Sequence, residues 1–197
     1  MSYDPPRPAG RLLLTPQDSE APARTLRLRR LGLGQQPEPA LDAFADRLAE
    51  LTGTPYAMVN FLDGERQFFA GLHTPEGGRA ARGGKPAVGR RLPREYGYCP
   101  HVVVRRRALA LEDVGDYPRF ACNPLVDEYG IRSYLGAPLT DSTGMVLGTV
   151  CVADLAPRPW GKAGLETIKS TAADLAVRLE ARTLLQGSGP GEGRTGD

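Results

Sequence analysis

The sequence is poor in the residues that most often build metal centres and disulfide frameworks. Its 197 residues include only 3 cysteines and 2 histidines, His73 and His101. No pair of these residues has the spacing of a structural zinc site, so we expect no bound metal. An odd number of cysteines, in a chain that begins without an apolar leader segment, also argues against a disulfide framework.

Long apolar runs and a strong charge of one sign are also missing. No run approaches the ~20 residues that span a bilayer, so we expect a cytosolic protein that does not enter a membrane. The net charge is +2, and basic residues alternate with acidic ones along most of the chain, which does not suggest nucleic-acid binding. Neither a phosphate-binding glycine motif nor a Gly-x-Ser-x-Gly elbow is present, so no catalytic residues are assigned.

What is present is a composition typical of a globular domain with tails. Residues 1–24 contain 5 prolines and no apolar periodicity, which predicts a flexible arm. Residues 25–185 are expected to fold as one domain, because 41% of the chain is hydrophobic and 24% charged. Residues 186–197 are glycine-rich and polar and predict a disordered tail.

Periodicity and turn signals within residues 25–185 predict an alternation of helices and strands. We expect helices at residues 25–33, 40–52, 99–107 and 163–185, and strands at 56–62, 66–72, 108–112, 133–139 and 145–152. In the first helix Leu26, Leu28 and Leu33 are expected to point inward. Gly136 and Gly148 lie inside two strands, where glycine suits a close approach of another group.

The last predicted helix carries a narrow apolar seam at alternating spacings of three and four residues. The seam consists of Leu165, Ile168, Ala172, Leu175 and Leu179. It fits packing against the sheet, and it equally fits a dimer interface with a second copy of the chain.

Residues 74–95 interrupt the regular pattern with glycines and arginines. We interpret this segment as a solvated flexible insertion. The alternative is a lid whose arginines clamp an anion.

Five segments, in order along the chain, together resemble the GAF domain family of small-molecule sensors. They are LDGERQFFAGL at residues 62–72, YCPHVV at 98–103, EDVGDYPRFACNPLV at 112–126, IRSYLGAPL at 131–139 and GMVLGTVCVADLAPR at 144–158. The resemblance covers residues 26–184. It implies an α+β fold with a six-stranded antiparallel sheet, terminal helices on one face, and a loop-enclosed pocket on the other.

The resemblance also implies a function without catalysis. We expect a sensor or regulatory module that binds a small molecule of unknown identity and signals through a homodimer or a partner protein. No catalytic module is expected within these 197 residues. The candidate ligand-binding residues are Phe69, Tyr98, Cys99, His101, Asp113, Phe120, Cys122, Asn123 and Tyr134. Among them, Asp113 and Asn123 suit a role in fixing the loop at least as well.

One branch of the family, the free methionine-R-sulfoxide reductases, supplies an alternative function. By resemblance to its motifs, Cys122 would attack the sulfoxide and Cys99 would resolve the product as a disulfide. A further cysteine expected before the first motif is absent, because residues 56–98 contain none. Cys151 lies in a predicted strand and is interpreted as buried core. A haem or bilin would depend on His101 or Cys99 alone, so no cofactor is assigned.

Overall fold

Six antiparallel strands form one sheet in the computed structural model, which describes residues 15–75 and 88–187. The strands are β1 (Tyr56–Leu62), β2 (Arg66–His73), β3 (Arg91–Pro93), β4 (Leu109–Leu111), β5 (Ser133–Thr140) and β6 (Val146–Asp154). Their order across the sheet is β3-β2-β1-β6-β5-β4. The expected six-stranded antiparallel sheet is therefore confirmed.

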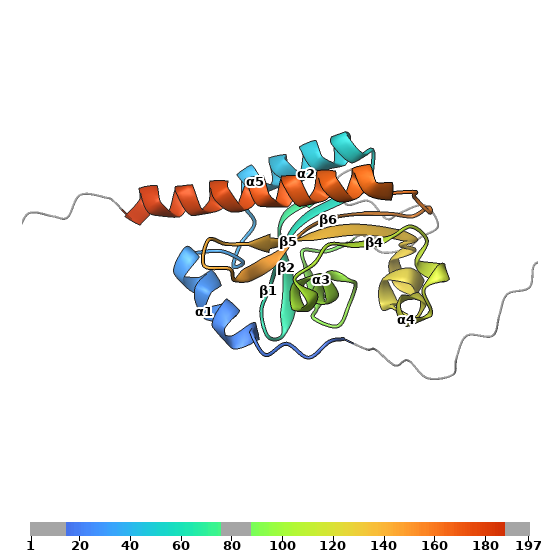
Figure 1. Ribbon diagram of the computed structural model, residues 1–197, viewed down its shortest axis with the longest axis horizontal. Helices are drawn as coiled ribbons and strands as arrows, with labels where there is room; N and C mark the ends of the chain where they lie inside the picture. The colour runs from blue at the N-terminus through green and yellow to red at the C-terminus, as the bar shows by residue number, and fades with distance from the viewer. Residues whose placement is uncertain (1–14, 76–87, 188–197) are drawn as a thin grey trace, which may run out of the picture.

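The helices divide between the two faces of the sheet (Figure 1). They are α1 (Ala21–Leu31), α2 (Pro39–Thr52), α3 (Cys99–Arg105), α4 (Pro118–Ala121) and α5 (Gly161–Gly187), with a 3-10 turn at Val114–Asp116 and a π-helical turn at Leu125–Tyr129. The long helices α2 and α5 lie together on one face, and α3 and α4 lie on the other. In the described residues no helix is both long and apolar enough to span a membrane.

Strand alternation separates two apolar cores, one on each face of the sheet. On β1, Val59 and Phe61 pack toward α2 and α5, whereas Met58 and Leu62 face the side of α3. The same alternation places Phe68 on the first face and Phe69 on the second. The second core, between the sheet and the shorter elements, surrounds the candidate site.

The seam of α5 lies inside the chain's own first core. Ile168, Ala172, Leu175 and Leu179 are buried, and Leu165 is half-buried against the same core. Of the two packing modes that fit the seam, packing on the sheet is the one present. These side chains are therefore occupied within one chain, and a second copy would have to contact a different face of α5.

The N-terminal helix begins at Ala21, four residues before its predicted start. Leu28 and Leu33 are buried as expected, but Leu26 is 55% exposed, so its inward assignment was wrong. The reason is helical phase: the fully buried Arg24 and Leu28 are four residues apart and occupy the inner face. The segment just before residue 25 is thus part of the folded body.

Part of the expected insertion at 74–95 is ordered against the body. Arg90 forms two hydrogen bonds with the Asp42 carboxylate, both of 2.9 Å, and Arg94 bonds Asp18 at 3.1 Å. The guanidinium of Arg91 lies 5.5 Å from the ring centre of Phe68. These three arginines have separate partners and do not converge on one anion. The rest of the proposed lid, residues 76–87, lies outside the described residues.

Candidate functional site

A small cavity lies on the sheet face opposite α2 and α5. Its volume is about 30 Å³. It is lined by Tyr56, Met58, Gln67, Phe69, Val88, Leu92, Tyr96, Gly97, Tyr98, Cys99, Leu125, Ile131, Tyr134, Cys151 and Ala153. Strands β1, β2, β5 and β6 supply the floor, and the segment before α3 and the π-helical turn supply the walls. Most of this lining is apolar.

Two thiols and a phenol meet at one side of the cavity. Cys99, the first residue of α3, places its Sγ 3.7 Å from the Sγ of Cys151 in β6. The Oη of Tyr134 in β5 is 3.4 Å from the Cys99 Sγ. Cys99 is 5% exposed and Cys151 0%, so the sulfur pair is shielded from the outer surface.

Gly136 makes room for the phenol. It faces Cys151 across the β5–β6 ladder, and a Cβ added there would lie 2.2 Å from the Oη of Tyr134. Any larger residue would therefore displace the hydroxyl that contacts Cys99. This close contact agrees with the expectation for a glycine inside a strand at this position.

Hydrogen bonding between the two thiols shifts their pKa values in opposite directions. The pKa of Cys99 is lowered, chiefly because the Cys151 thiol donates to it, while burial opposes the shift. The pKa of Cys151 is raised by the same hydrogen bond and by burial. Burial raises the pKa of Tyr134, which stays a neutral phenol. Cys99 is therefore the sulfur that ionises more readily.

The hydroxyl of Tyr98 has no hydrogen-bond partner within the described part of the chain. Tyr98 is 1% exposed, and burial raises the pKa of its phenol. Its ring packs edge-on against Phe120, with ring centres 5.7 Å apart. A buried hydroxyl without a partner costs about 1–3 kcal/mol, which a hydrogen-bonding ligand or water would offset.

Asn123 supports the cavity wall without lining the cavity. Its Oδ1 accepts hydrogen bonds from the backbone N–H of Gly97 (2.9 Å) and of Leu125 (3.1 Å). Its Nδ2 donates to the Gly97 carbonyl at 3.1 Å. Both backbone partners belong to lining residues. Asn123 therefore fixes the loop, which is the structural role that the sequence had suggested as an alternative.

The candidate ligand residues divide into two groups in the structure. Phe69, Tyr98, Cys99 and Tyr134 line the cavity together. His101, Asp113, Phe120, Cys122 and Asn123 do not. Asp113 caps the 3-10 turn and pairs with Arg132 at 2.5 Å, and Cys122 is half-buried elsewhere.

His101 and Phe120 form a buried aromatic pair behind the wall. Their rings meet edge to face, with centres 4.9 Å apart. Burial, followed by the charges of Arg119 and Arg105, lowers the pKa of His101 to about 4. The imidazole is thus neutral at neutral pH, and it packs as a core residue.

Several lining residues were not among the candidates, most importantly Cys151. It is as deeply buried as predicted, but its sulfur contacts Cys99 and not only core side chains. Apolar side chains such as Met58 and Ile131 carry no signal that separates a cavity from a filled core. Within residues 15–75 and 88–187, no three His, Cys, Asp or Glu side chains are grouped closely enough to hold a metal ion.

Comparison with known proteins gives the cavity a family context. A family model described as GAF domain matches residues 36–179. A cyclic di-GMP phosphodiesterase of Pseudomonas aeruginosa is 33% identical over 133 residues, which make up 64% of this chain and 20% of that protein. The chain therefore spans a small part of the length of this relative.

Three solved structures with the same fold are similar over most of the chain. The blue-light-absorbing form of the Thermosynechococcus elongatus PixJ GAF domain has a TM-score of 0.60 at 16% identity, covering 88% of this chain and 95% of that one. Free methionine-R-sulfoxide reductase from Neisseria meningitidis, in complex with its substrate, has a TM-score of 0.58 at 18% identity, covering 86% and 96%. The GAF domain of an Acinetobacter phosphoenolpyruvate-protein phosphotransferase has a TM-score of 0.56 at 15% identity, covering 87% and 99%. By the match over residues 36–179, the chain belongs to the GAF domain family.

Proposed function

We propose that this GAF domain binds a small, mainly apolar molecule in the cavity beside Tyr98 and reports it to a partner protein or a second copy of the chain. The observation that carries the proposal is the buried Tyr98 hydroxyl, which has no hydrogen-bond partner in residues 15–75 and 88–187, at a site whose other walls are mostly apolar. Ligand sites in proteins combine an apolar lining with a few placed polar groups. The ligand is expected to accept or donate one hydrogen bond at Tyr98.

The size of the cavity suggests how binding would be reported. About 30 Å³ is room for two or three water molecules, because each needs about 10–15 Å³ of such space. A larger ligand would have to move a wall, and the walls are short elements: the segment before α3 and the turn Leu125–Tyr129. A ligand that favours the moved wall shifts the equilibrium between two conformations, which is the physical basis of a sensor.

The proposal is tested with a matched pair of tyrosine variants. The purified chain is first analysed by native mass spectrometry and absorption for a bound molecule. It is then tested by thermal shift against small apolar alcohols and aromatic compounds, alongside cyclic nucleotides, amino acids and tetrapyrroles. Tyr98→Phe removes only the buried hydroxyl, whereas Tyr117→Phe changes a tyrosine that is 38% exposed. We expect Tyr98→Phe to weaken binding of the identified ligand by about tenfold, the value of one hydrogen bond of ~1.4 kcal/mol, and Tyr117→Phe to leave it unchanged. No bound molecule and no thermal shift with any compound would contradict ligand binding.

The reductase alternative is tested by looking for its product, methionine. Free methionine-R-sulfoxide, incubated with the protein and dithiothreitol, would yield methionine if the chain had this activity. The mechanism predicted from the sequence requires Cys122, so the activity should disappear in Cys122→Ser. Cys122 lies outside the cavity and the sulfur in contact with Cys99 is that of Cys151, so the geometry gives this alternative no added support.

A further inference from the structure

The Cys99 and Cys151 sulfurs are close enough to react with each other. They are 3.7 Å apart, and a disulfide bond is about 2.05 Å long, so the two atoms need to approach by about 1.6 Å. The two residues come from separate elements, the first turn of α3 and the middle of β6, which pack directly on each other. A bond between them would therefore join a cavity wall to the cavity floor.

Access to this pair is through the cavity. Both side chains are buried, which ordinarily makes a thiol inert. Both also line the cavity, whose volume of about 30 Å³ suits a molecule of two or three heavy atoms. Hydrogen peroxide has two heavy atoms and is uncharged, so it matches this space, whereas glutathione does not.

We propose that Cys99 and Cys151 are a peroxide-responsive dithiol that closes reversibly to an intramolecular disulfide in the cavity. In the first step the Cys99 thiolate attacks one oxygen of hydrogen peroxide. The O–O bond breaks, an S–O bond forms, and hydroxide leaves, so that Cys99 becomes a sulfenic acid. In the second step the Cys151 sulfur attacks the Cys99 sulfur, the S–O bond breaks, and hydroxide leaves with the Cys151 proton as water.

The electron balance closes with the peroxide as the only oxidant. Two thiols and one hydrogen peroxide give one disulfide and two waters, and two electrons pass from sulfur to oxygen. A dithiol reductant reverses the reaction by thiol–disulfide exchange. The order of the steps follows from the lowered pKa of Cys99, which the Cys151 thiol stabilises by donating to it.

The surroundings favour a disulfide between Cys99 and Cys151 over a bond to Cys122 and over binding of a metal ion. Cys122 does not line the cavity, and within the described part of the chain the sulfur that contacts Cys99 is that of Cys151. A structural zinc ion needs four ligands, and no group of three suitable side chains occurs in residues 15–75 and 88–187. Tyr134, 3.4 Å from Cys99, provides a neutral hydroxyl that can donate to the thiolate.

Closure of the disulfide would change the candidate ligand site. It would remove the thiolate that Tyr134 contacts and fix the start of α3 against β6. Oxidation would thereby restrain the wall that a ligand is expected to move. The dithiol does not depend on the existence of that ligand, so the inference stands independently of the proposed function.

The test counts the free thiols of the full chain before and after treatment with peroxide. The protein is reduced, freed of reductant without oxygen, treated with increasing hydrogen peroxide and then freed of peroxide. It is next unfolded in guanidinium chloride with excess N-ethylmaleimide, because the buried thiols are not accessible to this reagent in the folded chain, and digested with trypsin at mildly acidic pH. Cleavage after arginine and lysine places the 3 cysteines in separate peptides, residues 95–105, 120–132 and 133–162. We expect the maleimide count to fall from three to one, the remaining label on Cys122, and a cross-linked peptide pair that is two hydrogens lighter than the reduced pair.

Two variants make the result specific. Cys122→Ser should still close the disulfide, whereas Cys151→Ser should stop at a Cys99 sulfenic acid that dimedone traps when it is present during unfolding. Circular dichroism of Cys151→Ser confirms that it is folded, and dithiothreitol should restore all labels in the wild type. A disulfide that includes Cys122, or retention of all three labels at peroxide levels that oxidise N-acetylcysteine, would overturn the proposal. Closure only in urea would also overturn it, because the folded cavity would then play no part.

Discussion

His101 is a buried imidazole that lies outside the cavity beside Tyr98. It is 5% exposed, its ring meets Phe120 edge to face, and its Nδ1 has no hydrogen-bond partner among the described residues. Arg105 and Arg119 lie near enough for their charges to oppose its protonation. All three effects favour the neutral ring, so protonation of His101 should oppose folding.

This opposition predicts a dependence of stability on pH. In the unfolded chain the pKa of histidine is about 6.5, and in the folded chain that of His101 is about 4. Between these two pH values His101 is protonated in the unfolded chain and neutral in the folded chain. The contribution of His101 to the free energy of unfolding is therefore complete above about pH 6.5 and decreases as the pH falls toward 4. We expect a loss of up to about 3 kcal/mol in the free energy of unfolding from this residue.

Urea unfolding at several pH values between neutral and acidic measures the loss. Other groups also titrate in this range, so the informative quantity is the difference from His101→Phe, which keeps the aromatic volume and cannot be protonated. The variant should lose less stability on acidification than the wild type does. Equal pH profiles would show that His101 is readily protonated in the folded chain.

Individual residues differ in how well their surroundings could be predicted from the sequence. Tyr98, Cys99 and Tyr134 follow from motifs that carry unusual side chains, and all three line the cavity. The place of Cys151 in the cavity could not be predicted, because a cysteine in an apolar strand fits a filled core equally well. Only tertiary packing, which brings α3 onto β6, distinguishes a sulfur that contacts another sulfur from one that contacts hydrocarbon.

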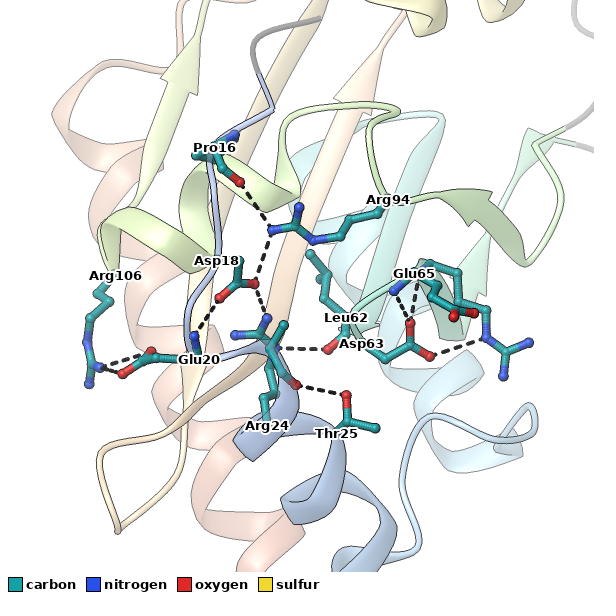
Figure 2. A network of polar contacts seen from close by, with 12 residues as sticks. Pro16, Asp18, Glu20, Arg24, Thr25, Leu62, Asp63, Glu65, Arg94 and Arg106 are labelled. Carbon is teal, nitrogen blue, oxygen red and sulfur yellow. Dashed lines mark hydrogen bonds and ion pairs between the residues drawn. The ribbon is translucent and has the colours of Figure 1, made fainter.

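At the scale of elements, α1 is held to the body by a network of arginines and one aspartate (Figure 2). The Nε of Arg24 donates to the Leu62 carbonyl at 2.9 Å, and its Nη2 contacts the Asp18 carboxylate. The same carboxylate oxygen accepts a bond from Arg94 at 3.1 Å. Asp18 therefore places one negative charge between two guanidinium groups that are largely buried, 0% exposed for Arg24 and 15% for Arg94.

Removing that one charge should destabilise the chain strongly. Asp18→Asn keeps the size of the side chain and an acceptor oxygen but leaves two buried cations facing each other. We expect a loss of about 3–5 kcal/mol in the free energy of unfolding, the cost of breaking a buried ion pair. Thermal and urea unfolding, followed by circular dichroism, provide the measurement.

Glu20→Gln is the matched control for this change. It is the same acid-to-amide exchange two residues further along, and Glu20 pairs with Arg106 at 3.0 Å on the surface, where both side chains are more than 40% exposed. Exposed pairs contribute about 0–1 kcal/mol, so this variant should be nearly neutral. Similar losses in the two variants would contradict the importance of burial at Asp18.

Elements with strong periodicity were predicted well and those defined by pairing were not. Strands β1 and β2 and helix α2 agree with their predicted ranges within one residue at each end, because alternation and helical spacing are local. Strand β3 has three residues, including a proline, and becomes a strand only through its bonds to β2. The start of α1 was missed because a buried arginine looks polar in sequence, and its partners Asp18 and Leu62 are supplied by the fold.

Over the whole molecule, the outer faces of α2 and α5 combine exposed apolar side chains with a groove, and we propose this surface as the contact for a second copy. The apolar seam of α5 is already buried in its own core, as described above. Leu51 on α2 and Val177 on α5 are instead 68% and 67% exposed. A groove between these helices, with a volume of about 170 Å³, is lined by Phe44, Arg47, Leu48, Leu51, Thr171, Asp174 and Arg178.

A dimer formed through this surface should therefore depend on Val177 and not on the seam. Val177→Glu places a charge on the proposed interface, and burying it without a partner would cost several kcal/mol. We expect the dimer dissociation constant, measured by sedimentation equilibrium, to rise at least tenfold. The unfolding free energy of the monomer, measured at concentrations far below that constant, should not change, because Val177 is exposed in the single chain. Lys169→Gln, on an exposed position of the same helix, lowers the net charge by the same one unit and serves as the control. A chain that stays monomeric at every concentration would contradict the dimer and leave a different protein as the receiver of the signal. A dimer that Val177→Glu does not weaken would place the interface elsewhere.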